Sequence, residues 1–281
     1  MMLKLILINL LLLRCSATFS SNFLFFLEDL YGREIAETLA RTDIGHEGSF
    51  GGGFHVPKTK TDKDPVIFIH GYTGYADDFM DQVDFMKLQE YDDTTLYGTT
   101  YGEWYGPIDR MNQTGMACKY VKAIRRLIVA VSIYTNRTVN LIGVSMGGAL
   151  TRKAMLGGRC VETNEDLGKP LSHLINNYIG VVGVMHGAAF CENSTEAACN
   201  SVFGMRCHSK YLKDINSKTG YEGRRPFVIE STGDILVGYN VCGTHPSEYV
   251  GGHIIKYHGF DHTPTYRNSF QVQYLIVSEQ L

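Results

Sequence analysis

The feature that most limits how this chain can fold is a short serine motif flanked by glycines. Residues 143–147 read Gly-Val-Ser-Met-Gly, a G-x-S-x-G pattern that follows an apolar, β-branched run and precedes a helical pattern. Between a strand and a helix, this pattern makes a strained turn that lifts the serine hydroxyl clear of the sheet edge, and small flanking residues let the two backbones approach. The motif therefore predicts that Ser145 is a nucleophile, with Gly143 and Gly147 forming its elbow.

Strand-like and helix-like segments alternate along the rest of the chain. Strands are expected at 65–69, 96–101, 139–142, 178–185 and 226–230, and helices at 28–42, 77–90, 113–135 and 149–156, with a last helix starting at Thr263-Pro264. This alternation predicts the α/β class, with a mostly parallel central sheet and helices on both faces. Together with the serine motif it predicts an α/β-hydrolase fold in a single domain over 21–281. The glycine-rich stretch 48–53 lacks the Lys-Ser/Thr of a phosphate-binding loop and is interpreted as a turn.

A serine hydroxyl is a weak nucleophile near neutral pH, so it needs a general base and an acid that orients this base. On this fold the acid follows the serine in the chain, and the histidine follows the acid. Asp234 comes just after the strand expected at 226–230 and is the predicted acid, whereas its competitor Glu230 lies inside the strand pattern. His262 directly precedes the last expected helix and is the predicted base. Two rival histidines lie farther upstream, His253 and His258.

An oxyanion hole requires two backbone N–H groups directed at the negative charge that develops during acyl transfer. One is expected from Met146, the residue after the nucleophile. The other is expected from the loop after the first strand, residues 70–72 (His-Gly-Tyr), and is assigned to Tyr72. The position of His70 before the nucleophile in the chain favours a role in shaping this loop over a role as base.

Four stretches together resemble the class 2 triacylglycerol lipase family, a set of small secreted lipases. They are 68–72 (Phe-Ile-His-Gly-Tyr), 143–148 (Gly-Val-Ser-Met-Gly-Gly), 231–234 (Ser-Thr-Gly-Asp) and 259–263 (Gly-Phe-Asp-His-Thr), and the similarity runs from about Gly48 to near the C-terminus. The resemblance implies hydrolysis of acylglycerols or similar lipid esters, with no metal and no redox cofactor. It also implies a triad of Ser145, Asp234 and His262, with Tyr72 and Met146 as oxyanion donors.

The N-terminus has the pattern of a secretory signal over residues 1–20. Lys4 precedes an apolar run at 5–13, and residues 15–17 (Cys-Ser-Ala) offer small side chains for cleavage, with a cut nearer Ser20 as the alternative. The run is shorter than the roughly 20 residues that span a bilayer, and no other segment is long and apolar enough to do so. The chain is therefore expected to be secreted, and a buried N-terminal helix is the competing interpretation.

Loss of Cys15 with the signal would leave an even number of cysteines, which in an exported chain suggests disulfides. The candidates are Cys118, Cys160, Cys191, Cys199, Cys207 and Cys242. Cys118 and Cys160 flank the nucleophile strand and helix and are expected to pair. Cys199 with Cys207 would close a short loop and leave Cys191 for Cys242. No C-x-x-C spacing indicates a zinc site. Three sequons also suit export, at Asn112, Asn136 and Asn193.

The stretch 189–223, between two expected strands, contains three of these cysteines and one sequon. α/β-hydrolases often place a cap or lid in such a connection, and disulfides would restrict its opening at a lipid surface. Hydrolysis of lipid esters is the leading interpretation, and a lipid–water interface is one place where such a substrate would be met. The alternatives are an acyltransferase or thioesterase with the same triad, and a non-catalytic lipid-binding protein. With a net charge of −3 and no basic stripe, the chain is not expected to bind nucleic acid.

Overall fold

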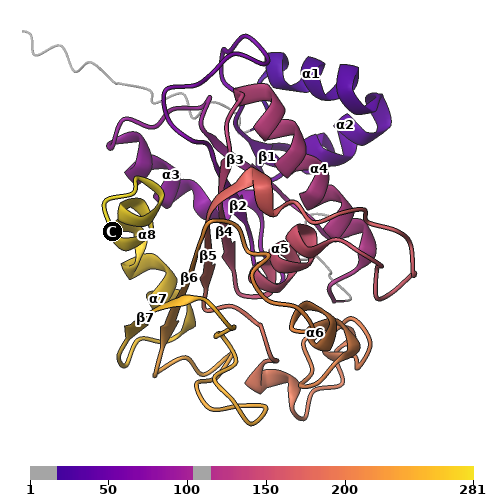
Figure 1. Ribbon diagram of the computed structural model, residues 1–281, viewed down its shortest axis with the longest axis vertical. Helices are drawn as coiled ribbons and strands as arrows, with labels where there is room; N and C mark the ends of the chain where they lie inside the picture. The colour runs from indigo at the N-terminus through magenta and orange to yellow at the C-terminus, as the bar shows by residue number, and fades with distance from the viewer. Residues whose placement is uncertain (1–17, 104–114) are drawn as a thin grey trace, which may run out of the picture.

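Seven strands form one mostly parallel sheet at the centre of the computed structural model, which describes residues 18–103 and 115–281 (Figure 1). The strand order is β1-β3-β2-β4-β5-β6-β7, and every neighbouring pair is parallel except β1 and β3. The strands are β1 Ser49–Phe50, β2 Val66–Ile69, β3 Leu96–Thr99, β4 Val139–Val144, β5 Ile175–Val181, β6 Arg225–Ser231 and β7 His253–Tyr257. The predicted α/β class is confirmed.

Helices cover both faces of this sheet. In Figure 1, α1, α2, α4 and α5 lie on one side, while α3, α7 and α8 lie on the other, and α6 packs against α5. The helices are α1 Ser21–Tyr31, α2 Arg33–Ala40, α3 Met80–Lys87, α4 Cys118–Thr135, α5 Met146–Leu156, α6 Lys210–Ile215, α7 His262–Asn268 and α8 Phe270–Val277. Within the described residues, no helix is both long and apolar enough to cross a bilayer.

Strand β2 shows how the sheet separates two hydrophobic cores. All four of its residues are buried. Ile67 and Ile69 join the core under α1, α4 and α5, whereas Val66 and Phe68 join the core under α3 and α8. Successive side chains of a strand point to opposite faces, so a continuous apolar run is what a strand covered on both sides requires.

The helix expected at 28–42 is wrong in its bounds, because it begins earlier and is divided in two. The hydroxyl of Ser20 accepts a hydrogen bond from the N–H of Phe23 and starts α1 at Ser21. Gly32 then adopts φ 84° and ψ 161°, which ends α1 before α2 begins. A backbone with positive φ is readily available to glycine, and it breaks the helical path.

Other element boundaries also differ from the prediction. Strand β5 begins three residues before the expected Tyr178, and the chain leaves the sheet at Val182, where φ is 43°. The stretch 48–53 is not only a turn, because it contains β1. The helix expected to start at Thr263-Pro264 is α7, which begins at His262 with Asp261 as its N-cap, and a further helix, α8, follows it. Strand β7 was not predicted, since it lies at the sheet edge and much of it is exposed.

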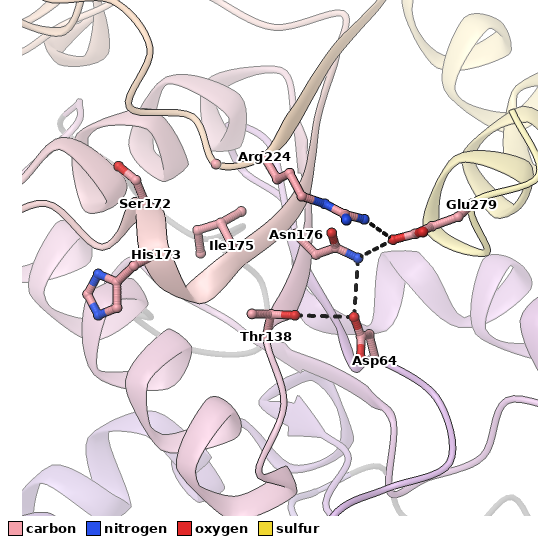
Figure 2. A pocket seen from close by; sticks show the side chains of 9 residues that line it. Asp64, Thr138, Ser172, His173, Ile175, Asn176, Arg224 and Glu279 are labelled. Atoms are coloured by element: carbon pink, nitrogen blue, oxygen red, sulfur yellow. Dashed lines mark hydrogen bonds and ion pairs between the residues drawn. The ribbon is translucent and has the colours of Figure 1, made fainter.

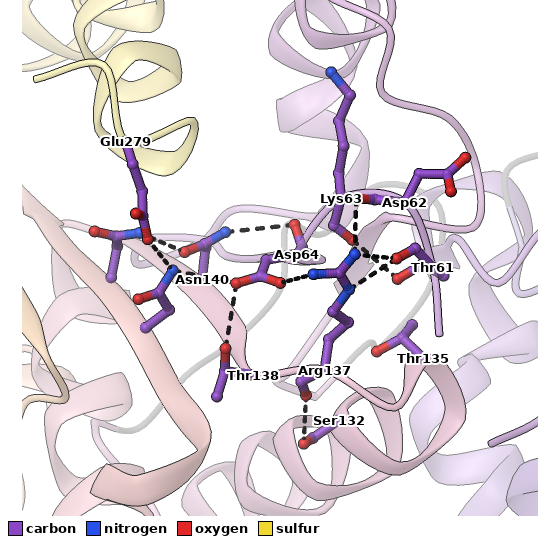
Figure 3. Close-up of polar contacts among 12 residues, drawn as sticks. Thr61, Asp62, Lys63, Asp64, Ser132, Thr135, Arg137, Thr138, Asn140 and Glu279 are labelled. Carbon is purple, nitrogen blue, oxygen red and sulfur yellow. Dashed lines mark hydrogen bonds and ion pairs between the residues drawn. The ribbon is translucent and has the colours of Figure 1, made fainter. Parts of the chain in front are cut away.

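The amino edge of the sheet contains a polar network beside an open cavity of about 580 Å³. In Figure 2 the buried amide of Asn176 points toward Asp64 and Glu279, and its Nδ2 donates to Asp64 Oδ2 at 3.2 Å and to Glu279 Oε1 at 2.8 Å. Figure 3 shows Arg137 reaching the other oxygen of Asp64, at 3.2 Å. The polar groups of these side chains bond to one another. The network therefore connects the C-terminal end of the chain to the starts of the strands.

Candidate active site

Ser145 lies at the opposite edge of the sheet, directly after β4 and at the N-terminus of α5. The six residues of β4 place it about 20 Å from the amino edge. Its backbone has φ 55° and ψ −124°, a conformation that costs energy for a residue with a side chain. The structure thus contains the strained strand–turn–helix that the motif predicted.

The two elbow glycines are required by close backbone contacts. A Cβ atom on Gly147 would lie 2.3 Å from the carbonyl oxygen of His70, and one on Gly143 would lie 2.8 Å from Cα of Gly148. Both distances are far below van der Waals contact. Strand β4, helix α5 and the loop after β2 can therefore meet around Ser145 only because these positions have no side chain.

Asp234 and His262 lie in contact, although 28 residues separate them. The Nδ1 atom of His262 is 2.7 Å from Oδ2 of Asp234. The other carboxylate oxygen, Oδ1, accepts hydrogen bonds from the N–H groups of Leu236 and Val237, both at 2.9 Å. Since a carboxylate only accepts, this geometry places the imidazole proton on Nδ1 and leaves Nε2 of His262 as a proton acceptor.

The competing acid and histidines have other surroundings. Glu230 lies inside β6, and its carboxylate is 3.1 Å from the ammonium of Lys256. Burial raises the pKa of Glu230. His258 is exposed. His253 is also exposed, and its ring contacts the ring of Phe227. Among the rivals in the described residues, none reproduces the close contact of Asp234 with His262.

The register of the sheet brings the three predicted catalytic residues to one edge. The N–H of Ser145 donates to the carbonyl of Val181 at the end of β5, at 2.9 Å. The N–H of Thr232, just after β6, donates to Tyr257 at the end of β7, at 3.1 Å. Asp234 and His262 are in direct contact and Ser145 lies at the same edge, but no hydrogen bond between Ser145 and His262 is formed in the described part of the chain.

The loop after β2 contacts the serine. A Cβ atom on Gly71 would lie 3.0 Å from Cβ of Ser145 and 3.6 Å from its Oγ. The ring of His70 stabilises this loop. Its Nε2 accepts a hydrogen bond from the N–H of Tyr101 at 3.0 Å, so the ring proton is on Nδ1, which donates to the carbonyl of Gly71 at 2.8 Å. Burial lowers the pKa of His70 to about 3. The ring is therefore neutral near pH 7 and holds the shape of the loop.

The two expected oxyanion residues come from different parts of the chain, Met146 from α5 and Tyr72 from the loop after β2. Met146 is the first residue of α5 and is fully buried. The hydroxyl of Tyr72 donates to Oε2 of Glu196 at 3.0 Å, and its ring stacks against Phe190 at 6.2 Å between centroids. Burial, with the hydrogen bond to Glu196, raises the pKa of Tyr72 to about 12. The stretch 189–199 thus contacts the loop that touches Ser145.

Three disulfides link the expected cysteines, but two of the expected pairings are wrong. Cys118 pairs with Cys160 as predicted. The other two bonds are Cys191–Cys199 and Cys207–Cys242. Short turns at Ala189–Cys191 and Ala197–Cys199 fold the chain back, so the Cα atoms of Cys191 and Cys199 lie 5.2 Å apart. The expected short loop, Cys199–Cys207, is wrong because Cys191 lies at the same sequence distance from Cys199, and spacing alone could not choose between the two loops.

The segment 189–223, expected to form a cap or lid, is also attached to α5 by buried charges that were not predicted. Arg152 on α5 and Glu222 are each about 2% exposed, and the guanidinium lies 2.8 Å from the carboxylate. Arg152 also donates to the side chain of Asn216 at 2.7 Å and to the carbonyl of Ile215 at 3.0 Å. The next residue, Lys153, pairs with Asp214 at 2.6 Å. Two adjacent cations on a helix normally indicate a solvent-facing side, so composition alone did not reveal these contacts.

Comparison with known proteins identifies the family. The family model described as Lipase (class 2) matches residues 63–275, which is most of the chain. This chain belongs to the class 2 lipase family. The family and the fold together identify the class 2 lipase as an ester hydrolase. The family resemblance inferred from the sequence motifs is confirmed. No curated protein matches the sequence.

Solved structures show the same fold at low sequence identity. The mature form of the lipase BlEst2 from Bacillus licheniformis is 15% identical, with a TM-score of 0.56 over 82% of this class 2 lipase and 97% of the bacterial chain. Lipase B from Aspergillus fumigatus is 14% identical, with a TM-score of 0.54 over 82% of this chain and 55% of the fungal one. The α/β-hydrolase fold predicted for the class 2 lipase is thereby confirmed.

Proposed function

We propose that this class 2 lipase is a secreted enzyme that cleaves the carboxylic esters of lipids through Ser145, His262 and Asp234. The observation that carries the proposal is the 2.7 Å contact between His262 and Asp234, formed at the same sheet edge as the strained turn of Ser145. The contact selects one tautomer of the imidazole and leaves Nε2 available to accept the serine proton.

The reaction then follows in two steps. As Oγ of Ser145 attacks the ester carbonyl carbon, its proton passes to Nε2 of His262, and Asp234 stabilises the resulting cation. The tetrahedral oxyanion accepts hydrogen bonds from the N–H groups of Met146 and Tyr72. The imidazolium returns its proton to the leaving alcohol, which leaves an acyl-serine. Water attacks this acyl-enzyme with His262 again as base, which releases the acid and restores the serine.

Exposed apolar side chains support a lipid ester as the substrate. Ile235 and Leu236, directly after the acid, are 72% and 46% exposed, and Phe260, two residues before the base, is 39% exposed. Large apolar side chains in water at a site of this kind indicate contact with an apolar partner. An acyl chain or a lipid surface would cover them.

A serine-directed fluorophosphonate probe tests the proposal. The secreted wild-type protein is expected to be labelled on one serine and to hydrolyse nitrophenyl esters of increasing acyl length. Labelling should disappear in Ser145→Ala. Absence of labelling in the folded wild-type protein would favour a non-catalytic lipid-binding protein, and labelling that persists in Ser145→Ala would place the nucleophile elsewhere.

Export is supported by the three disulfides and by the exposure of two sequon asparagines, Asn136 and Asn193, while Asn112 lies outside the described residues. The signal expected at 1–20 overlaps the start of the described chain. Within this overlap Phe19 is 5% exposed and packs edge-on against Phe23 at 4.9 Å, and Ser20 caps α1. These contacts favour cleavage after Ala17 over cleavage near Ser20.

Mass spectrometry of the secreted protein is therefore expected to find Thr18 as the first residue. Cleavage after Ser20 would remove the cap of α1 and a buried aromatic ring. Losing such a cap alone costs about 1 kcal/mol. A mature chain that begins at Ser21 would contradict this prediction.

A further inference from the structure

A single carboxylate oxygen joins the loop that carries the predicted acid to the loop that carries the predicted base. Oδ1 of Asp261 accepts a hydrogen bond from the N–H of His262 at 2.7 Å and another from the N–H of Ile235 at 3.1 Å. Ile235 is the residue after Asp234, and Asp261 is the residue before His262. The backbone beside the acid and the backbone of the base are thus held by the same atom.

The two loops are in contact at other points as well. A Cβ atom on Gly233 would lie 2.6 Å from the carbonyl carbon of Gly259, so the backbones touch there. The hydroxyl of Thr232 accepts the N–H of Gly259 at 3.3 Å. These contacts come before the catalytic residues in both loops. Beyond them, the side chain of Asp261 adds a second connection between the two loops, next to the contact of Asp234 with the imidazole.

The charge of Asp261 suits this role. Its hydrogen bonds from His262 and Ile235 hold the pKa of Asp261 below its ordinary value, so its carboxylate is ionised near pH 7. The anion also lies at the N-terminus of α7, where backbone N–H groups are unpaired and the helix dipole favours negative charge. His262 is the first residue of that helix, so the cap determines where the base begins.

We propose that Asp261 is a positioning residue for His262, which fixes the separation between the acid loop and the base loop. The inference rests on the proposed function of the Ser145 triad. A displacement of about 1 Å at a catalytic group can lower the rate about 10²-fold, even when binding of the substrate is unchanged. Asp261 acts by preventing such a displacement through its contact with Ile235, in addition to capping α7.

Three substitutions separate the bridge between the loops from the helix cap. Asp261→Asn keeps an oxygen in the same place and can make both hydrogen bonds. Asp261→Ser keeps a good helix cap, but its shorter side chain cannot reach Ile235. Asp261→Ala removes both contacts. Ser20→Ala is a matched control, because it removes the cap of α1 without touching either catalytic loop.

Turnover is measured with a soluble nitrophenyl ester per probe-reactive serine, and Tm is measured on the same samples. We expect Asp261→Ser and Asp261→Ala to lower kcat about 10- to 100-fold with little change in KM, and Asp261→Asn to recover most of the loss. Tm should fall in Asp261→Ala and in Ser20→Ala, with kcat retained in Ser20→Ala.

Two results would overturn the proposal in different ways. If Asp261→Ser keeps wild-type kcat, the contact with Ile235 does not position the base, and Asp261 is only a helix cap. If Ser145→Ala remains active in the same assay, the proposed triad itself fails. A loss of kcat that follows Tm in all four variants would assign the effect to general stability and would also reject the positioning role.

Discussion

Ser145→Ala is expected to fold and to be secreted like the wild-type protein, and to lose ester hydrolysis by a factor on the order of 10⁵ to 10⁶. The serine hydroxyl forms no hydrogen bond in the described part of the chain, and alanine meets the same backbone strain at this φ and ψ. Removing Oγ therefore removes the nucleophile and little else. Loss of turnover with an unchanged Tm is the result that separates a catalytic serine from a structural one.

His262→Ala is expected to lose a similar factor, because groups of a triad act as one unit. His258→Ala is its matched control: that side chain is exposed, lies four residues upstream and should leave kcat/KM nearly unchanged. The three variants are compared on a short soluble ester, with secreted yield as the measure of folding. Equal loss of activity in His258→Ala and His262→Ala would contradict the assignment of the base.

Arg152→Ala is expected to have the largest effect on stability, lowering the free energy of unfolding by about 3–5 kcal/mol. The substitution leaves the carboxylate of Glu222 buried at 2% exposure with its cation removed, and it also removes the ring contacts of the guanidinium with Tyr221 and Tyr249. Because a domain is typically stable by only about 5–15 kcal/mol, secreted yield should also fall.

Denaturation in urea with the disulfides intact measures this loss. Lys122→Ala is the matched control, because its ion pair with Glu165 is 37% and 49% exposed and should contribute at most about 1 kcal/mol. In the double variant Arg152→Met with Glu222→Leu, part of the loss should be recovered, since replacing both partners avoids an unpaired buried charge. A loss in Arg152→Ala no greater than in Lys122→Ala would contradict the buried-pair argument.

The parts of the site that depend on local sterics were predictable from the sequence. The glycines around Ser145 indicate that backbones approach closely there. This requirement is visible in the five residues 143–147 alone. Chain order then selected Asp234 and His262, and the structure places these two in contact. The elbow and the contact of Asp234 with His262 thus needed no knowledge of distant packing.

The remaining differences come from turns and contacts that local sequence patterns do not distinguish. The pairing of Cys191 with Cys199 depends on turns that no local pattern distinguished. Strand β7 has exposed residues because it lies at an edge, so its alternation is weak. The burial of Arg152 depends on Glu222, 70 residues later. Asp261 caps α7 one residue before His262, and its carboxylate also accepts a hydrogen bond from Ile235. This second contact depends on tertiary structure and could not be read from the sequence.

The segment 189–223 is attached to the rest of the fold in both of its halves. Its first half contains the disulfide Cys191–Cys199 and contacts Tyr72. Its second half is held to α5, the helix that follows Ser145, by Arg152 and Lys153. Attachment at both ends is expected to keep this segment in one position relative to α5. If the proposed lipid substrate contacts this segment, we expect preference among acyl chains to depend on the side chains of the segment more than on its length.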